Sequence, residues 1–108
     1  MLKIDGNDIY LTRGNTAIID VEIMNGDEPY VMQNDDVLEF AVRRSCEFNN
    51  VVLSKRRNEP SFVFIPNDTK DLSLGEYIYS ITLFGDNGII DTFINGKFTI
   101  ECEVYEND

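Results

Sequence analysis

The chain has 108 residues and a formal net charge of −11 at pH 7, because it contains 20 acidic and nine basic residues. A chain of this length forms one core. It is too apolar for intrinsic disorder, since 43% of its residues are hydrophobic and 11% are aromatic. Nucleic acid and anionic membranes are poor partners for such an acidic chain, since both are bound mainly through Lys and Arg. No apolar run reaches the roughly 18 residues of a transmembrane helix. We therefore predict a single β-sandwich domain over residues 1–108, with neither nucleic acid nor membrane as a partner.

Strand-forming segments follow one another along the chain, each with apolar residues at alternate positions. In residues 16–24, for example, every second side chain from Ala17 to Ile23 is apolar and belongs to one face. No segment has the apolar period of a full helix. Strands are expected at residues 8–12, 16–24, 36–44, 50–54, 61–65, 75–84, 89–94 and 97–105.

Turn residues separate these segments. The sequence GDNG at 85–88 predicts a tight hairpin, because Gly, Asn and Asp tolerate a positive φ. The pair Asn95-Gly96 predicts another turn, between the last two strands. One helical turn is expected just after residue 65, with Asn67 or Asp68 as its N-cap.

Seven to nine short strands without a long helix indicate an all-β fold, a single Ig-like antiparallel β-sandwich. Tyr77 follows a polar turn at the start of a strand, as does the tyrosine that ties the corner of Ig-like sandwiches through its hydroxyl. We predict this role for Tyr77, and we expect Tyr79 to point into the core beside it.

The two cysteines, Cys46 and Cys102, form no CxxC pair. No export signal is visible at the start of the chain, so both thiols are expected to stay reduced, with a disulfide across the sandwich as the alternative. Cys102 shares the apolar side of a predicted strand with Phe98 and Ile100, which predicts a small buried hydrophobic residue.

Residues suited to catalysis are scarce. The chain has no His, the commonest general base and metal ligand, and nothing near Cys46 completes a catalytic triad. Acid-rich turns at 25–29, 33–36, 67–71 and 85–88 carry oxygen ligands that Ca²⁺ accepts, but none has the EF-hand spacing. Turn chemistry explains them better. We predict no catalytic, cofactor-binding or metal-binding residues, and no cofactor.

The charge is unevenly distributed. Residues 43–57 contain five basic residues and one acidic residue, a balance of +4, which leaves four basic and 19 acidic residues, or −15, elsewhere. The basic segment either keeps an edge strand from aggregating or docks on an acidic partner or a second copy. In the second case, the residues predicted to bind the partner are Lys55, Arg56 and Arg57 with Val51, Val52 and Leu53 beside them.

Three features are spread over almost the whole chain. They are Asp5-Gly6 followed by LTRG at 11–14, a strand at 36–45 that ends in basic residues, and Leu-x-x-Gly-x-Tyr-x-Tyr at 72–79 with Gly96 and Phe98 after it. This pattern resembles a family of small bacteriophage tail proteins. In particular, it is similar to the N-terminal Ig-like domain of the upper baseplate proteins of phages that infect Gram-positive bacteria.

The resemblance implies a non-enzymatic virion protein that anchors or decorates the tail or baseplate after synthesis in the bacterial host cytoplasm. Its implied partners are other tail or baseplate proteins, and a homo-oligomer is a further possibility. Because no receptor-binding region follows before Asp108, a standalone component or a small module is expected. A carbohydrate-binding or adhesive β-sandwich acting at the host surface is the alternative, with Phe48, Tyr30 and Tyr105 as candidate contacts. A small enzyme on a sandwich scaffold is a third class.

Overall fold

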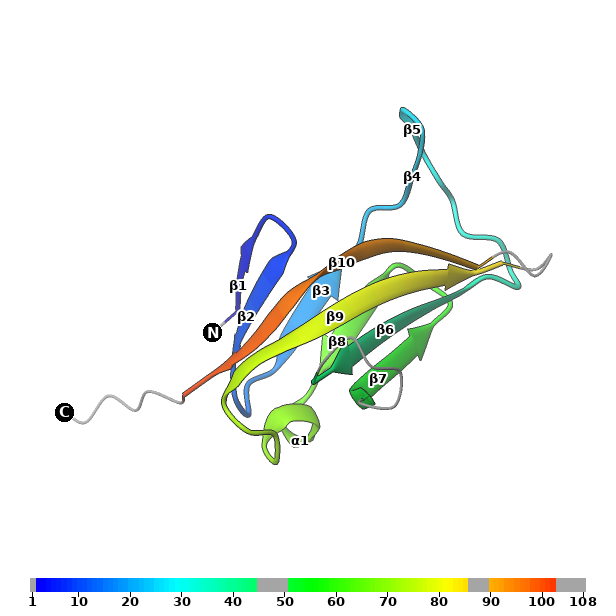
Figure 1. The fold of residues 1–108 in the computed structure, drawn as a ribbon. Helices are drawn as coiled ribbons and strands as arrows, with labels where there is room; N and C mark the ends of the chain where they lie inside the picture. The colour runs from blue at the N-terminus through cyan, green and yellow to red at the C-terminus, as the bar shows by residue number, and fades with distance from the viewer. Residues whose placement is uncertain (1, 45–50, 86–89, 103–108) are drawn as a thin grey trace.

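The computed structural model describes residues 2–44, 51–85 and 90–102, which form ten strands and one short helix (Figure 1). The elements are β1 (Leu2–Asp5), β2 (Asp8–Thr12), β3 (Ala17–Asp20), β4 (Met24–Asn25), β5 (Glu28–Pro29), β6 (Val37–Arg43), β7 (Val51–Arg57), β8 (Ser61–Phe64), α1 (Pro66–Thr69), β9 (Gly75–Phe84) and β10 (Ile90–Glu101). No helix in this part of the chain is long and apolar enough to cross a membrane.

The strands form a β-sandwich, so the predicted fold class is confirmed. One layer is a six-stranded sheet in the order β1-β2-β10-β9-β6-β7, and the other is the pair β3-β8 (Figure 1). Neighbouring strands run antiparallel except β2 and β10, which run parallel. A parallel pair needs a long connection, and here nearly the whole domain lies between the two strands.

Aromatic side chains from both layers fill the core. Phe40 on β6 stacks on Tyr79 with ring centroids 5.0 Å apart, and it meets Phe64 on β8 edge-on at 5.1 Å. Phe62 and Phe98 pack against the same ring at 5.3 and 5.9 Å. Such geometries add about 0.5–1.5 kcal/mol per pair beyond the apolar area that they bury. This cluster therefore holds the two layers together.

The predicted tyrosine corner is confirmed. Tyr77 is buried, and its hydroxyl donates a hydrogen bond of 2.7 Å to the carbonyl oxygen of Ser73, four residues upstream. Tyr79 is also buried, and its hydroxyl donates to the carbonyl oxygen of Asn7 in the turn between β1 and β2. Both rings therefore occupy the core while their polar ends are satisfied.

The expected turn at Asn95-Gly96 is wrong. Both residues lie inside the continuous strand β10, where Gly96 pairs with Tyr79 on β9, and a register shift occurs earlier, after Thr92. A Cβ on Gly96 would lie 3.0 Å from the carbonyl carbon of Asn7 and 3.2 Å from Cε1 of Tyr79. Glycine is needed here for the close approach of the β1-β2 turn, and not for a change of chain direction.

Several strand boundaries also differ from those expected. Strand β3 ends at Asp20, three residues after it begins, whereas β7 continues to Arg57 through the basic residues. Strand β1 and the pair β4-β5 have no counterpart among the predicted strands. The predicted hairpin turn at 85–88 lies mostly outside the described residues.

The expected helical turn exists, but its capping differs. Ile65 is the N-cap of α1, and Asp68 lies in the first turn, where its carboxylate accepts the backbone N–H of Ile65 at 2.8 Å. The prediction of Asn67 or Asp68 as N-cap is therefore wrong, because Pro66 begins the helix and shifts its start.

The predicted burial of Cys102 is also wrong. Phe98 and Ile100 on β10 are buried, but Cys102 follows the last paired residue of the strand, Glu101, and is exposed. Cys102 lies beyond the end of the core, so an apolar residue at this position of the alternating pattern is not buried. Cys46 lies outside the described residues, so the expected reduced state of both thiols stays a prediction.

Residues 24–36, here called the arm, contain β4 and β5. The β4-β5 hairpin projects away from both layers (Figure 1), whereas Tyr30 and Met32 pack against the core. At the base of the arm, the buried carboxylate of Asp36 accepts the Tyr30 hydroxyl and, at 2.8 Å, the backbone N–H of Gln33. The structure is elongated, with extents of 53 × 30 × 23 Å.

Candidate protein interface

Strand β7 lies at the edge of the six-stranded sheet, where among the described strands it pairs only with β6. In an antiparallel pair, alternate residues direct their N–H and C=O groups to the partner, so the remaining residues direct theirs to the open side. The partner-binding residues predicted from the sequence thus lie on a strand with one open side. All three basic residues lie within the strand itself.

Strand alternation divides the predicted basic patch between two faces. Lys55 pairs with the core residue Phe40, and Arg57 pairs with Leu38, so both side chains lie on the face toward β3-β8. Arg56 pairs with Glu39 and lies on the outer face. The three basic side chains therefore do not form one continuous patch.

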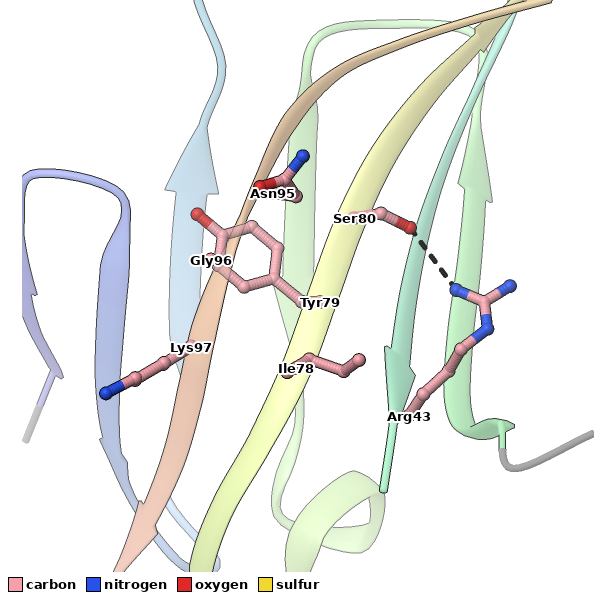
Figure 2. A pocket seen from close by; sticks show the side chains of 7 residues that line it. All are labelled: Arg43, Ile78, Tyr79, Ser80, Asn95, Gly96 and Lys97. Atoms are coloured by element: carbon pink, nitrogen blue, oxygen red, sulfur yellow. Dashed lines mark hydrogen bonds between the residues drawn. The ribbon is translucent and has the colours of Figure 1, made fainter. Parts of the chain in front are cut away.

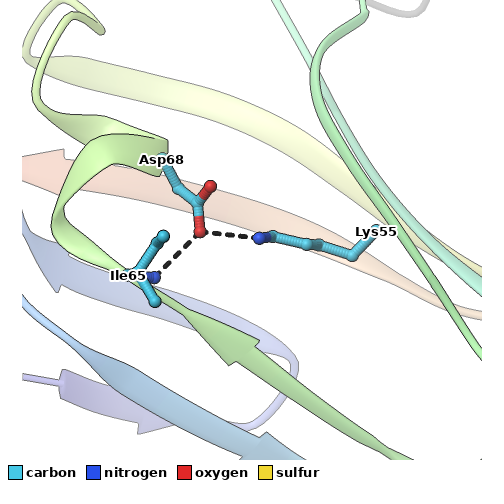
Figure 3. A network of polar contacts seen from close by, with 3 residues as sticks. All are labelled: Lys55, Ile65 and Asp68. Atoms are coloured by element: carbon cyan, nitrogen blue, oxygen red, sulfur yellow. Dashed lines mark hydrogen bonds and ion pairs between the residues drawn. The ribbon is translucent and has the colours of Figure 1, made fainter.

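Lys55 joins the edge strand to the second layer. Its Nζ lies 2.7 Å from Oδ2 of Asp68, the oxygen that also accepts the Ile65 N–H (Figure 3). The same ammonium lies 5.8 Å from the ring centroid of Phe64. Because its charge is already paired, Lys55 has less to offer a partner than the sequence suggested.

The other two basic residues of β7 are paired as well. Arg56 donates from Nε to Glu39 Oε2 at 2.8 Å, and its guanidinium carbon lies 5.2 Å from the ring centroid of Phe84. Arg57 pairs with Glu59 just after the strand. Of these, the Arg56 side chain is the most exposed, at 63%. Arg56 is therefore the best-placed of the three for a partner.

The apolar members of the predicted site differ in exposure. Val51 is exposed at 44% and pairs with Arg43, beside a register shift in the ladder. Leu53 pairs with the core residue Val42 and packs against the core, as does Val52. Val51 is thus the apolar side chain of β7 that is open to contact.

A groove of about 490 Å³ lies on the sheet, lined by residues of β6, β9 and β10 (Figure 2). Ser80 and Gly96 are small, while the long side chains of Arg43 and Lys97 lie on opposite sides. Ile78 contributes apolar surface and Asn95 a side-chain amide. Ligand pockets commonly have volumes of about 300–1,000 Å³, so the groove has room for a few side chains of a partner.

The two cations of the groove differ in their partners. Arg43 donates from Nη1 to Ser80 Oγ at 3.3 Å and forms no ion pair with another described residue. Lys97 Nζ lies 3.9 Å from Glu76 Oε1, and both side chains are well exposed. A guanidinium has five N–H donors in a planar fork, so Arg43 retains donors that suit a carboxylate.

Two tyrosines have perturbed acidity. Burial, and secondarily the negative charge of Asp8, raise the pKa of Tyr79 above the ordinary value of 10.0. The hydrogen bond to Asp36, followed by desolvation and the charge of the same carboxylate, raises the pKa of Tyr30. Both hydroxyls therefore stay protonated in the folded chain near neutral pH and act as hydrogen-bond donors.

The described residues contain no group of three or more His, Cys, Asp or Glu side chains that could hold a metal ion. In two of the acid-rich turns, the carboxylates of Asp36 and Asp68 accept backbone N–H groups. This is the hydrogen bonding that Asp provides in ordinary turns.

Sequence reasoning missed the groove and the arm. The groove combines residues from three strands, β6, β9 and β10, so no local sequence pattern predicts it. One available signal was Gly96 inside a strand-like segment, which often marks a close approach of backbone. For the arm, a signal was the stretch 14–42, which contains seven acidic residues and no Lys or Arg.

Comparison with known proteins supports the fold but gives no family for the chain. No family model and no curated protein matches the sequence. The structure is an Ig-like β-sandwich. It is similar to a solved structure of the fibronectin(III)-like modules of Clostridium thermocellum CbhA, with a TM-score of 0.51 and 12% identity over 94% of each chain. At this identity the likeness concerns the fold alone.

Proposed function

We propose that the protein is a non-enzymatic structural component of a bacteriophage tail or baseplate, joined to its neighbours by protein-protein contacts. The observation that carries this proposal is the open side of β7, a seven-residue strand whose first residue, Val51, has an exposed side chain. An added strand from a partner would bond to the backbone groups on that side, while Val51 supplies apolar contact. The chain's lack of His supports a role without catalysis.

The assignment to a phage tail rests on the resemblance carried by the Leu-x-x-Gly-x-Tyr-x-Tyr element and the features around it. Within that element, Tyr77 and Tyr79 are core residues that stabilise the sandwich, and neither lies on β7. The element therefore supports the fold of the module, while contacts with partners use other surfaces.

A carbohydrate-binding or adhesive domain is the second candidate. Sugar sites commonly use aromatic rings that lie open on the surface, but Tyr30 is half-buried and its hydroxyl is bonded to Asp36. Phe48 and Tyr105, the other aromatic residues considered, lie outside the described residues. We place this function second because the open strand edge favours a protein partner.

Binding to phage tail and baseplate proteins tests the proposal. Each would be co-expressed with the wild type, with Val51→Glu and with Ile18→Glu, and complexes would be measured by sedimentation velocity. Ile18 is the matched control. Like Val51, it is an exposed β-branched apolar residue on a strand, but it lies on β3 in the other layer. Val51→Glu should weaken the complex at least about tenfold, or about 1.4 kcal/mol, and Ile18→Glu should not.

Arg56→Glu tests whether charge guides the same contact. If Arg56 helps to attract an acidic partner, the variant should associate more slowly and with less dependence on salt, because rim charges act mainly on the association rate. Equal binding by all the variants, or no complex with any tail protein, would contradict the proposal.

A further inference from the structure

The arm presents both acidic and apolar groups to solvent. Asp27 and Glu28 at its tip are exposed and form no ion pair with another described residue. Met24 is 47% exposed and Val31 is 75% exposed. These two side chains can supply apolar contact beside the charges of the arm.

The base of the arm is held in place before any contact forms. Besides the two hydrogen bonds to Asp36, the backbone N–H of Tyr30 donates to the carbonyl oxygen of Ile23 at 2.8 Å. Asp36 is only 3% exposed, so its carboxylate is largely shielded from water. A segment ordered in advance loses less conformational entropy on binding.

The groove on the six-stranded sheet has complementary chemistry. It presents the spare donors of Arg43, the ammonium of Lys97 and the amide of Asn95 around the apolar side chain of Ile78 (Figure 2). Carboxylates suit the cations, and Met or Val side chains suit Ile78. The arm carries both kinds of group on one short projection.

We propose that the arm of one copy docks in the groove of a second copy, with the carboxylates of Asp27 and Glu28 on Arg43 and Lys97. Charge complementarity favours this occupant, because the arm lies within residues 14–42, which contain seven acidic residues and no Lys or Arg, and Arg43 lacks a described carboxylate partner. Met24 and Val31 supply apolar contact beside the ion pairs. The contact uses a different surface from β7 and goes beyond the proposed function.

Each copy has one arm and one groove, and these are different surfaces. Copies can therefore exchange arms in a closed pair or join head to tail in a ring or filament. The net charge of −11 on each copy opposes association at long range. Near physiological ionic strength the screening length is about 8 Å, which weakens this repulsion while ion pairs in direct contact persist.

Charge reversal tests the contact on the full chain, with sedimentation equilibrium followed up to about 1 mM protein, where weak contacts are populated. The groove variant is Arg43→Glu, with Lys70→Glu as a control that makes the same charge change at an exposed position after α1. The arm variant is Asp27→Arg with Glu28→Arg. Its control is Asp20→Arg with Glu22→Arg, at two exposed acidic residues before the arm.

The groove and arm variants should each associate at least about tenfold more weakly than the wild type, and the controls should not. An equimolar mixture of the two variants should associate again, because each arm then meets a groove of opposite charge. In wild-type amide spectra, dilution should shift Gly26 and Asp27 together with Asn95 and Gly96. Circular dichroism would confirm that each variant is folded.

A monomeric wild type throughout this range would overturn the proposal. So would an arm variant that associates like the wild type, even if Arg43→Glu reduces association, because the groove would then hold something other than the arm. Failure of the mixture to associate would overturn it as well.

Discussion

Replacing Gly96 with Ala tests the close approach between the β1-β2 turn and β10. A Cβ at this position would lie 3.0 Å from the carbonyl carbon of Asn7 and 3.2 Å from Tyr79 Cε1. The nearest group is backbone, so the turn must move as a unit. The carbonyl that must move is also the acceptor of the Tyr79 hydroxyl.

Three effects determine the expected loss of stability. Overpacking costs about 1–3 kcal/mol, and weakening the Tyr79 hydrogen bond adds about 1 kcal/mol. Ala restricts the unfolded chain more than Gly does, and this effect offsets about 0.4–1 kcal/mol of the loss. We therefore expect Gly96→Ala to lower the free energy of unfolding by about 2 kcal/mol.

Urea unfolding followed by circular dichroism measures this loss. Asn95→Ala is the neighbouring control, and it should change stability by no more than about 0.5 kcal/mol because Asn95 is exposed. Combined with Tyr79→Phe, Gly96→Ala should cost less than the sum of the two single changes, since both act on one hydrogen bond. A Gly96→Ala variant as stable as the wild type would refute the reasoning.

Three other perturbations have expected outcomes. Tyr77→Phe should cost about 1 kcal/mol for the hydrogen bond to Ser73, while Tyr77→Ala should cost about 3 kcal/mol for a truncated core ring. Equal unfolding midpoints in urea for the two variants would contradict the role of Tyr77 as the tyrosine corner. Because the pKa of Tyr79 is raised above 10.0, protonated Tyr79 stabilises the fold fully below that pH, and this stability is lost as the pH rises through the raised pKa. The free energy of unfolding should thus fall above about pH 10, and less steeply in Tyr79→Phe, as urea titrations across that range would show; equal slopes would count against it. Lys55→Met removes a partly exposed ion pair with Asp68, so it should lower the free energy of unfolding by at most about 1 kcal/mol, as measured by thermal unfolding. A larger loss would mean that the pair stabilises the fold more than its exposure indicates.

Alternation of apolar residues predicted the core well, because burial on one face of a strand produces that pattern directly. Tyr77, Tyr79 and Phe98 are buried as expected, while Asp91 and Thr99 are more exposed. The tyrosine corner was also predictable, since its hydrogen bond spans only four residues.

Features that depend on distant parts of the chain were not predictable. Gly96 looked like a turn residue because the sequence does not show that Asn7 approaches it. The basic residues of β7 looked like an exposed patch because their acidic partners, such as Asp68 for Lys55, come from other elements. The groove likewise requires three strands to be brought together.

The central claim is that this chain is a structural part of a phage tail or baseplate. Quantitative mass spectrometry of purified tails, separated from free protein by gradient sedimentation, tests it most directly. The proposal predicts that the chain is present in a fixed ratio to the other tail proteins, and that Val51→Glu lowers this ratio. Absence of the chain from the tails, together with binding of the purified chain to host-surface saccharides, would contradict the claim.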